Sequence, residues 1–142
     1  MPDILHRVGV DAQPGRVFKA LSTIDGLRGW WVSETTGDAG TGGTIDFGFC
    51  QMQVIEAVPD QRIRWRCFQG PEEWVGTEVT FALVWKDDQT FIVFKHADWK
   101  EPVELMHHCS TKWATFLLSL RDLLETADGH PVPHDLKIHV GD

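Results

Sequence analysis

The chain has 142 residues, of which 42% are hydrophobic, and a formal net charge of −8 at pH 7. This length and apolar content suffice for one globular core, so we expect residues 1–142 to form a single domain. An acidic balance spread along the chain excludes a nucleic-acid-binding surface. No apolar run reaches the ~18 residues of a membrane helix, and the mixed charges of residues 1–11 are unlike a signal peptide.

The cysteines indicate the redox environment. Cys50, Cys67 and Cys109 are odd in number, far apart, and lie in apolar segments without a CxxC pair. This pattern favours small buried thiols over a zinc knuckle or a redox centre. We therefore expect a cytoplasmic protein.

The N-terminal part begins with a strand and continues with two short helices. Residues 4–11 alternate apolar and polar side chains, which predicts a strand. Pro14 suits a first helical position, and Val17, Phe18 and Leu21 share one helical face. Residues 22–25 can end this helix and cap a second one that runs through Leu27 and Arg28.

Between Thr44 and His96, apolar residues recur at every second position, except in the turns. Five strands joined by short turns predict an antiparallel meander. The apolar positions that we place on the inner faces of these strands are Ile45, Phe47 and Phe49; Met52 and Val54; Ile63, Trp65 and Cys67; Val79, Phe81, Leu83 and Trp85; and Ile92, Phe94 and His96.

A long amphipathic helix is predicted from Val103 to Glu125. Helical spacing relates its apolar residues, which are Cys109, Trp113, Phe116, Leu117, Leu120 and Leu124. The tail, residues 126–142, contains Gly129, Pro131 and Pro133 and is expected to be less regular. The whole order predicts an α+β fold in which a curved antiparallel sheet wraps around the long helix.

This order, with particular motifs in place, resembles the helix-grip superfamily of START-like and polyketide-cyclase-like (SRPBCC) proteins, whose fold is also that of the birch-pollen allergen. The chain is most similar to the small proteins grouped with the activator of heat-shock protein 90 ATPase. The motifs are "AQPGRVFKAL", the "WW" at Trp30 and Trp31, "VIEAVPDQRIRWRC", "TFIVFKHADW", "TKWATFLLSLRDLLE" and "GHPVPHD". The chain departs from relatives at Lys112, where they often have glycine, and at His6 in the first strand.

The resemblance implies a cavity between helix and sheet, with one tryptophan of the Trp30–Trp31 pair in the core and the other at the cavity rim. The alternative is that both rings cover the sheet edge. The expected lining consists of the inward apolar side chains, which are Trp30, Trp31, Phe47, Phe49, Met52, Val54, Ile63, Trp65, Phe81, Leu83, Ile92, Phe94, His96, Trp113, Phe116, Leu117 and Leu120.

Two polar residues are catalytic candidates. His96 shares its strand face with Ile92 and Phe94, so we expect it to point inward, with a pKa lowered by burial. Glu56 has the parity of Val54 and is also expected inward, where His96 or His6 would be its partner. Such a pair could perform acid–base chemistry. The alternative is that both residues are structural, with His96 bonded to a carbonyl or a carboxylate.

Neither a metal nor a cofactor is predicted. Successive helical residues point in different directions, so His107, His108 and Cys109 cannot converge on one ion. The tail histidines are spread over a segment that contains prolines. No phosphate loop, dinucleotide fingerprint or nucleophile elbow is present.

Three classes of function compete. A binding module for a small apolar molecule requires only the aromatic inner wall. The resemblance also implies enzymes of the cyclase, dehydratase or hydrolase type, for which only His96 and Glu56 are available. A co-chaperone role is disfavoured, because few residues precede the first strand, whereas the family's namesake has a further N-terminal domain. We predict the binding module, with no membrane insertion and with a homodimer left open.

Overall fold

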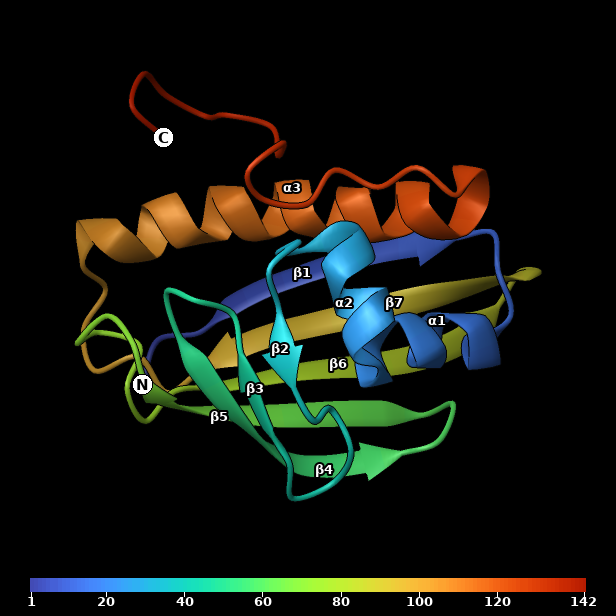
Figure 1. Ribbon diagram of the computed structural model, residues 1–142, viewed down its shortest axis with the longest axis horizontal. Helices are drawn as coiled ribbons and strands as arrows, with labels where there is room; N and C mark the ends of the chain where they lie inside the picture. The colour runs from blue at the N-terminus through green and yellow to red at the C-terminus, as the bar shows by residue number, and fades with distance from the viewer.

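The computed structural model describes residues 1–142, and its framework is one sheet of seven antiparallel strands in the order β1-β7-β6-β5-β4-β3-β2 (Figure 1). The strands are β1 (Ile4–Val10), β2 (Thr36–Gly37), β3 (Thr44–Asp46), β4 (Gln51–Val58), β5 (Arg62–Gln69), β6 (Glu78–Lys86) and β7 (Gln89–Ala97). The predicted strands are confirmed, and β2 is a short addition that the sequence pattern did not indicate. Because the chain pairs its first strand with its last, β1 and β2 are the two edges.

Two short helices, α1 (Pro14–Ser22) and α2 (Ile24–Trp30), follow β1 as predicted. Pro14 occupies the first turn of α1. Thr23 separates the helices, and its hydroxyl accepts a hydrogen bond from the backbone N–H of Gly26 at 3.0 Å, which caps α2. The two helices pack beside the C-terminal half of the long helix (Figure 1).

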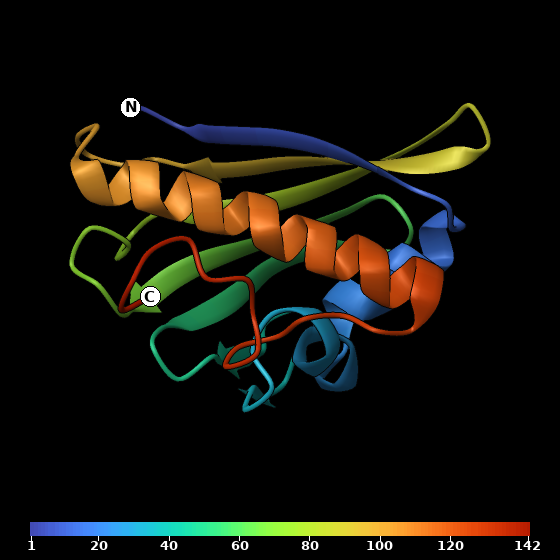
Figure 2. The ribbon, with the colours of Figure 1, turned by 90° about the horizontal axis from the view of Figure 1, so that it is seen from above.

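The long helix, α3 (Glu104–Thr126), crosses the concave face of the sheet (Figure 2). Its Trp113, Phe116, Leu117 and Leu120 are all buried against the sheet side, as the helical spacing predicts. Ala127 adopts the left-handed conformation and ends the helix. The tail then returns antiparallel to α3 along its flank (Figure 2).

Two predicted strand faces differ from the structure near their ends. Trp85 is predicted to lie inward with Phe81, but it is 46% exposed, because the β6–β7 hairpin extends beyond the core at that point. β3 ends at Asp46 rather than continuing through Phe49. Gly48 has a φ of 88°, so the chain turns there. No helix of the chain is both long enough and apolar enough to cross a membrane.

Candidate ligand-binding site

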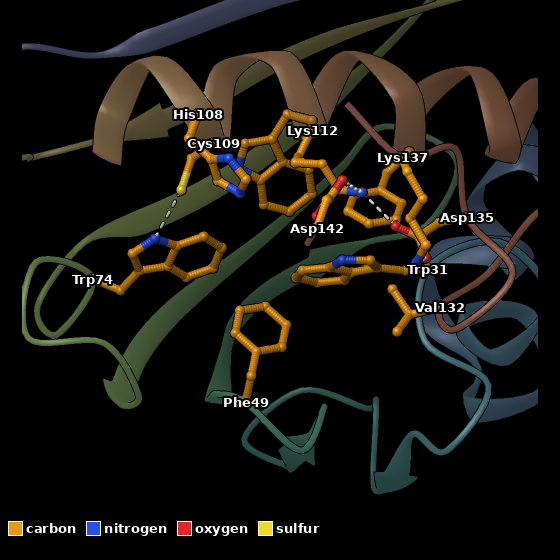
Figure 3. Close-up of a pocket in the computed structure, with 12 residues that line it drawn as sticks. Trp31, Phe49, Trp74, His108, Cys109, Lys112, Val132, Asp135, Lys137 and Asp142 are labelled. Carbon is orange, nitrogen blue, oxygen red and sulfur yellow. Dashed lines mark hydrogen bonds and ion pairs between the residues drawn. The ribbon is translucent and has the colours of Figure 1, made fainter. Parts of the chain in front are cut away.

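A hollow of about 280 Å³ opens beside the N-terminal half of α3 (Figure 3). Its walls come from α3, from the tail, and from the loops that precede β4 and β6. The apolar lining is Trp31, Phe49, Trp74, Cys109, Trp113, Phe116 and Val132, and the polar lining is His108, Lys112, Asp135, Lys137 and Asp142. The hollow therefore has an aromatic floor and a polar border.

Trp31 forms the centre of this floor. Its ring lies 4.7 Å from that of Trp113 and is stacked on Trp65 at 6.0 Å, with an angle of 8° between their planes. Phe49 stands at the mouth, 48% exposed, with its ring 6.0 Å from Trp31. The neighbouring Trp30 points into the core, where its indole N–H donates to the carbonyl of Ala20 at 3.0 Å.

The two tryptophans stand at the C-terminal end of α2. Trp31 is the C-cap residue, and its backbone N–H still donates to the carbonyl of Leu27. The two rings are stacked, 5.8 Å apart with an angle of 18° between their planes, and of the two only Trp31 lines the hollow. Both are at most 1% exposed, so Trp31 is a floor residue rather than a rim residue.

His96 lies behind the floor and is fully buried. The indole N–H of Trp113 donates to its Nδ1 at 3.1 Å, so the proton of the neutral ring is on Nε2. Nε2–H then donates to the hydroxyl of Thr77 at 2.8 Å, and that hydroxyl donates to the carbonyl of Trp74 at 2.6 Å. Burial lowers the pKa of His96 to about 3, the direction that the sequence predicts. The partners of His96 are thus an indole and a hydroxyl, not the carbonyl or carboxylate of the structural alternative.

Glu56 is not the partner of His96, and the prediction that it points inward is wrong. The register of β4 against β5 shifts between Val54 and Glu56, so that Ile55 is an extra residue. This bulge reverses the alternation, and Glu56 faces outward. Its carboxylate accepts a hydrogen bond from Nε of Arg62 at 2.7 Å, which lowers the pKa of Glu56.

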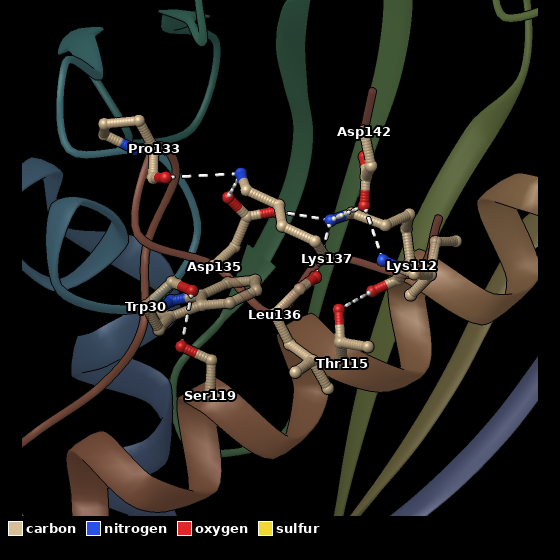
Figure 4. A network of polar contacts seen from close by, with 10 residues as sticks. Trp30, Lys112, Thr115, Ser119, Pro133, Asp135, Leu136, Lys137 and Asp142 are labelled. Carbon is tan, nitrogen blue, oxygen red and sulfur yellow. Dashed lines mark hydrogen bonds and ion pairs between the residues drawn. The ribbon is translucent and has the colours of Figure 1, made fainter. Parts of the chain in front are cut away.

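Lys112 is the centre of the polar border (Figure 4). Its ammonium donates to the carboxylate of Asp135, to the carbonyl of Leu136 at 3.0 Å, and to the carboxylate of Asp142 at 2.9 Å. Burial disfavours the charged form of Lys112, but the two carboxylates outweigh this effect and raise its pKa. These contacts attach the tail to α3 and build one wall of the hollow.

Asp135 is the most deeply buried carboxylate at the border, with its side chain 3% exposed. Burial alone would raise the pKa of the Asp135 carboxyl. The hydrogen bonds from Lys112 and Lys137 outweigh this effect, so the pKa is lowered. Lys137 donates at 2.7 Å and has a side chain that is 47% exposed. The four charges of Lys112, Lys137, Asp135 and Asp142 therefore sum to zero.

Cys109 contributes the smallest side chain of the helix wall. Its sulfur accepts a hydrogen bond from the indole N–H of Trp74 at 3.4 Å. Burial raises the pKa of the thiol, which keeps it protonated at neutral pH. All three cysteines are free and buried, as the sequence predicts.

Of the residues predicted to line a cavity, Trp31, Phe49, Trp113 and Phe116 do line the hollow. Most of the others contact one another in a continuous core, so the space between helix and sheet is filled there. These core residues are Trp30, Phe47, Met52, Val54, Ile63, Trp65, Phe81, Ile92, Phe94, Leu117 and Leu120, and Leu83 is half-buried at its edge. Along α3 the lining runs from His108 to Phe116, whereas the predicted lining ran from Trp113 to Leu120.

Sequence reasoning missed most of the polar border and also Trp74. Trp74 is the one large ring in a hairpin segment otherwise made of polar and small residues, which was a usable signal. Asp135 closes the motif "GHPVPHD", and its approach to Lys112 could not be read from spacing, because 22 residues lie between them.

Comparison with known proteins identifies the family of the chain. Residues 11–125 match the family described as "Activator of Hsp90 ATPase homolog 1-like protein". The chain belongs to this family. No curated protein sequence matches it.

The solved structure of the Aha1 dimer from Colwellia psychrerythraea is similar to this member of the family at 42% identity, with a TM-score of 0.84 over 91% of this chain and 100% of that one. CalU16 from Micromonospora echinospora has 21% identity and a TM-score of 0.75, over 87% of this chain and 74% of its own. A protein from Staphylococcus saprophyticus has 19% identity and a TM-score of 0.76, over 90% and 95% of the two chains. The structures from Micromonospora echinospora and Staphylococcus saprophyticus share the polyketide-cyclase-like fold, as the motifs predict.

Proposed function

We propose that this family member binds a small, flat, apolar molecule in the hollow beside α3. The observation that carries the proposal is the aromatic floor, in which Trp31 and Trp113 present their rings beneath an opening framed by Phe49. Ligand sites of this kind combine a mostly apolar lining with a few placed polar groups. The border of Lys112 and the tail supplies such groups.

The size of the hollow narrows the ligand class. Its volume of about 280 Å³ lies just below the ~300–1,000 Å³ that ligand pockets usually span. One or two fused rings fit this space better than a long acyl chain. Because Lys112 is already bonded to Asp135 and Asp142, the border offers no free buried charge, which favours a neutral ligand.

The two residues that the enzyme alternative requires, His96 and Glu56, do not form a pair. Both ring nitrogens of His96 are occupied by Trp113 and Thr77, and Glu56 is bonded to Arg62 on the other side of the sheet. A general base must reach the proton that it removes. We therefore favour a carrier or sensor over an acid–base catalyst.

The test is titration with a naphthalene-type fluorescent probe, followed through probe emission and tryptophan quenching. We expect one site per chain, and we expect Cys109→Trp to abolish binding by filling the hollow. The matched control is Leu118→Trp, on the same helix, where the native side chain is 40% exposed and does not line the hollow. Probe binding that is the same in both variants would refute the proposal.

We further propose that the chain forms a homodimer, because its relative from Colwellia psychrerythraea was solved as a dimer. A suitable apolar surface is the outer face of the sheet, where Leu5, Val84 and Val93 are 66%, 46% and 42% exposed. Size-exclusion chromatography with light scattering should give twice the chain mass of 16.1 kDa. Val93→Lys should shift it to the monomer, whereas Leu136→Lys in the tail should not.

A further inference from the structure

Three metal-ligating side chains that are distant in sequence meet where the tail wall reaches the N-terminal half of α3. His108 lies on α3, and His139 and Asp142 lie in the tail. One ligand atom from each lies within 4.8 Å of the other two. The two imidazole rings are 5.4 Å apart between centroids, at an angle of 52°. We propose that these residues form a binding site for a divalent transition-metal ion of the Zn²⁺ or Co²⁺ type.

The donor set fits this class of ion. Two imidazoles and one carboxylate are ligands that Zn²⁺, Co²⁺ and Ni²⁺ accept, whereas Ca²⁺ and Mg²⁺ prefer oxygen alone. Three protein ligands leave a fourth position for water or another small ligand. The site is therefore of the open type rather than a closed structural centre.

The ligands are already oriented by neighbouring groups. Nδ1 of His139 lies 2.8 Å from the carbonyl of Val140, which can only accept, so Nδ1 carries the proton and Nε2 keeps its lone pair. Oδ2 of Asp142 accepts from the backbone N–H of Ile138 and from Lys112, both at 2.9 Å. Oδ1 takes part in neither bond and is left for the ion. Such supporting hydrogen bonds are what fix the ligands of metal sites.

The three ligand atoms need to move only slightly closer together to hold one ion. Zn²⁺ ligands lie ~2 Å from the ion, so two ligands of one ion are ~3–4 Å apart. The three ligand atoms lie within 4.8 Å of one another, so small side-chain rotations bring them to this separation. Lys112 is the nearest cation, and its charge is balanced by Asp135.

Binding would join α3 to the tail by a second link beside the Lys112 network. Helical spacing prevents His107, His108 and Cys109 from converging on one ion. The additional ligands come from the returning tail, which spacing along the helix could not reveal. The inference does not depend on an apolar ligand in the hollow.

The experiment is titration of the chain, without a polyhistidine tag, with Co²⁺, followed by the visible absorption of the ion and by displacement with Zn²⁺. We expect one saturable ion per chain, with the tetrahedral-type Co²⁺ spectrum, and a rise in the melting temperature as the ion is added. His108→Gln and His139→Gln should each weaken binding by at least ~10-fold.

The matched controls are His107→Gln, one position away on α3, and His134→Gln, elsewhere in the tail. Both native side chains lie outside the cluster, so these variants should bind as the unmodified chain does. His139→Gln alters an exposed side chain and should fold normally, which near-ultraviolet circular dichroism can verify. Absence of saturable binding, or equal losses in the control variants, would overturn the proposal.

Discussion

The two halves of α3 rest on the same kind of aromatic surface, yet one half is sealed and the other is open. Beneath the C-terminal half, Leu117 and Leu120 are fully buried, and Ser119 donates to the carbonyl of Trp30 in α2 at 2.8 Å. Beside the N-terminal half, Cys109 and Phe116 border the hollow.

What differs is the element that covers each half. α1 and α2 are regular helices that bury their own apolar faces against α3 (Figure 1). The tail has little regular structure and is attached through polar contacts of Lys112 and Ser119 and through backbone hydrogen bonds of Val132 with Trp31 and Ser33. The comparison teaches that inward rings make a closed core only where a second apolar element covers them, and otherwise leave an open hollow.

The largest expected effect is the loss of unfolding free energy when the contacts of Lys112 with the tail are removed. Lys112→Ala leaves the buried carboxylate of Asp135 with only Lys137, and breaking a buried pair costs ~3 kcal/mol of unfolding free energy. Urea unfolding measures this loss. Lys137→Ala is the control, because its side chain is 47% exposed and its pair should contribute under ~1 kcal/mol. Equal losses in the two variants would mean that the tail is not held by Lys112.

The second prediction concerns His96, which lies where the closed and open regions meet. Its folded pKa of about 3 is below the ordinary value of 6.5, so between these pH values the unfolded chain binds one more proton than the native chain. The unfolding free energy should therefore fall by ~1.4 kcal/mol for each pH unit lowered through this window. His96→Gln should lose this slope while the carboxylate contributions persist. An unchanged slope would show that His96 is already protonated in the native state.

The third prediction compares two indoles of the closed core. Trp30 donates its N–H to Ala20, whereas the N–H of Trp65 is buried without a partner. Trp30→Phe should cost ~1 kcal/mol more than Trp65→Phe, because it leaves a carbonyl unsatisfied and Trp65→Phe removes an unpaired donor. Thermal and urea unfolding of the two variants provide the measurement. The reverse order would indicate that Trp65 has a hydrogen-bond partner, such as an ordered water.

The smallest effect on stability is expected at the mouth of the hollow. Phe49→Ala removes a ring that is already 48% exposed, so the loss of unfolding free energy should stay below ~1 kcal/mol. Probe affinity should nevertheless fall, since Phe49 frames the opening above Trp31. Phe68→Ala, at 46% exposure and outside the hollow, should change neither quantity appreciably.

The fold was largely predictable, because its signals are periodic. Period-two strands and a 3.6-residue helix identify the inner faces, as Ile63, Trp65 and Leu120 illustrate. The pattern failed where the backbone breaks the period. The bulge before Glu56 reverses a face that alternation alone would continue, and the turn at Gly48 moves Phe49 out of its strand.

The site was predictable only in its aromatic part. Trp31 and Trp113 could be identified from motif and spacing, and their neighbours in the core could not be distinguished from them, because hydrophobic pattern reports burial and not empty space. The polar border depends on the tail folding back to Lys112. That contact is set by tertiary structure, and no local pattern of the tail encodes it.

The indole rings of the floor and the core also provide a spectroscopic signal of the folded state. Trp30 and Trp31 lie 5.8 Å apart with an angle of 18° between their planes, and Trp74 and Trp113 lie 6.1 Å apart at the same angle. Electronic transitions of aromatic rings this close couple, and the coupled pairs generate near-ultraviolet dichroic bands that neither helices nor strands produce. One pair belongs to the closed region and its junction with the floor, and the other borders the hollow. Because Trp31 and Trp113 themselves lie 4.7 Å apart, the two pairs form one coupled array, and its bands should change when either region loosens.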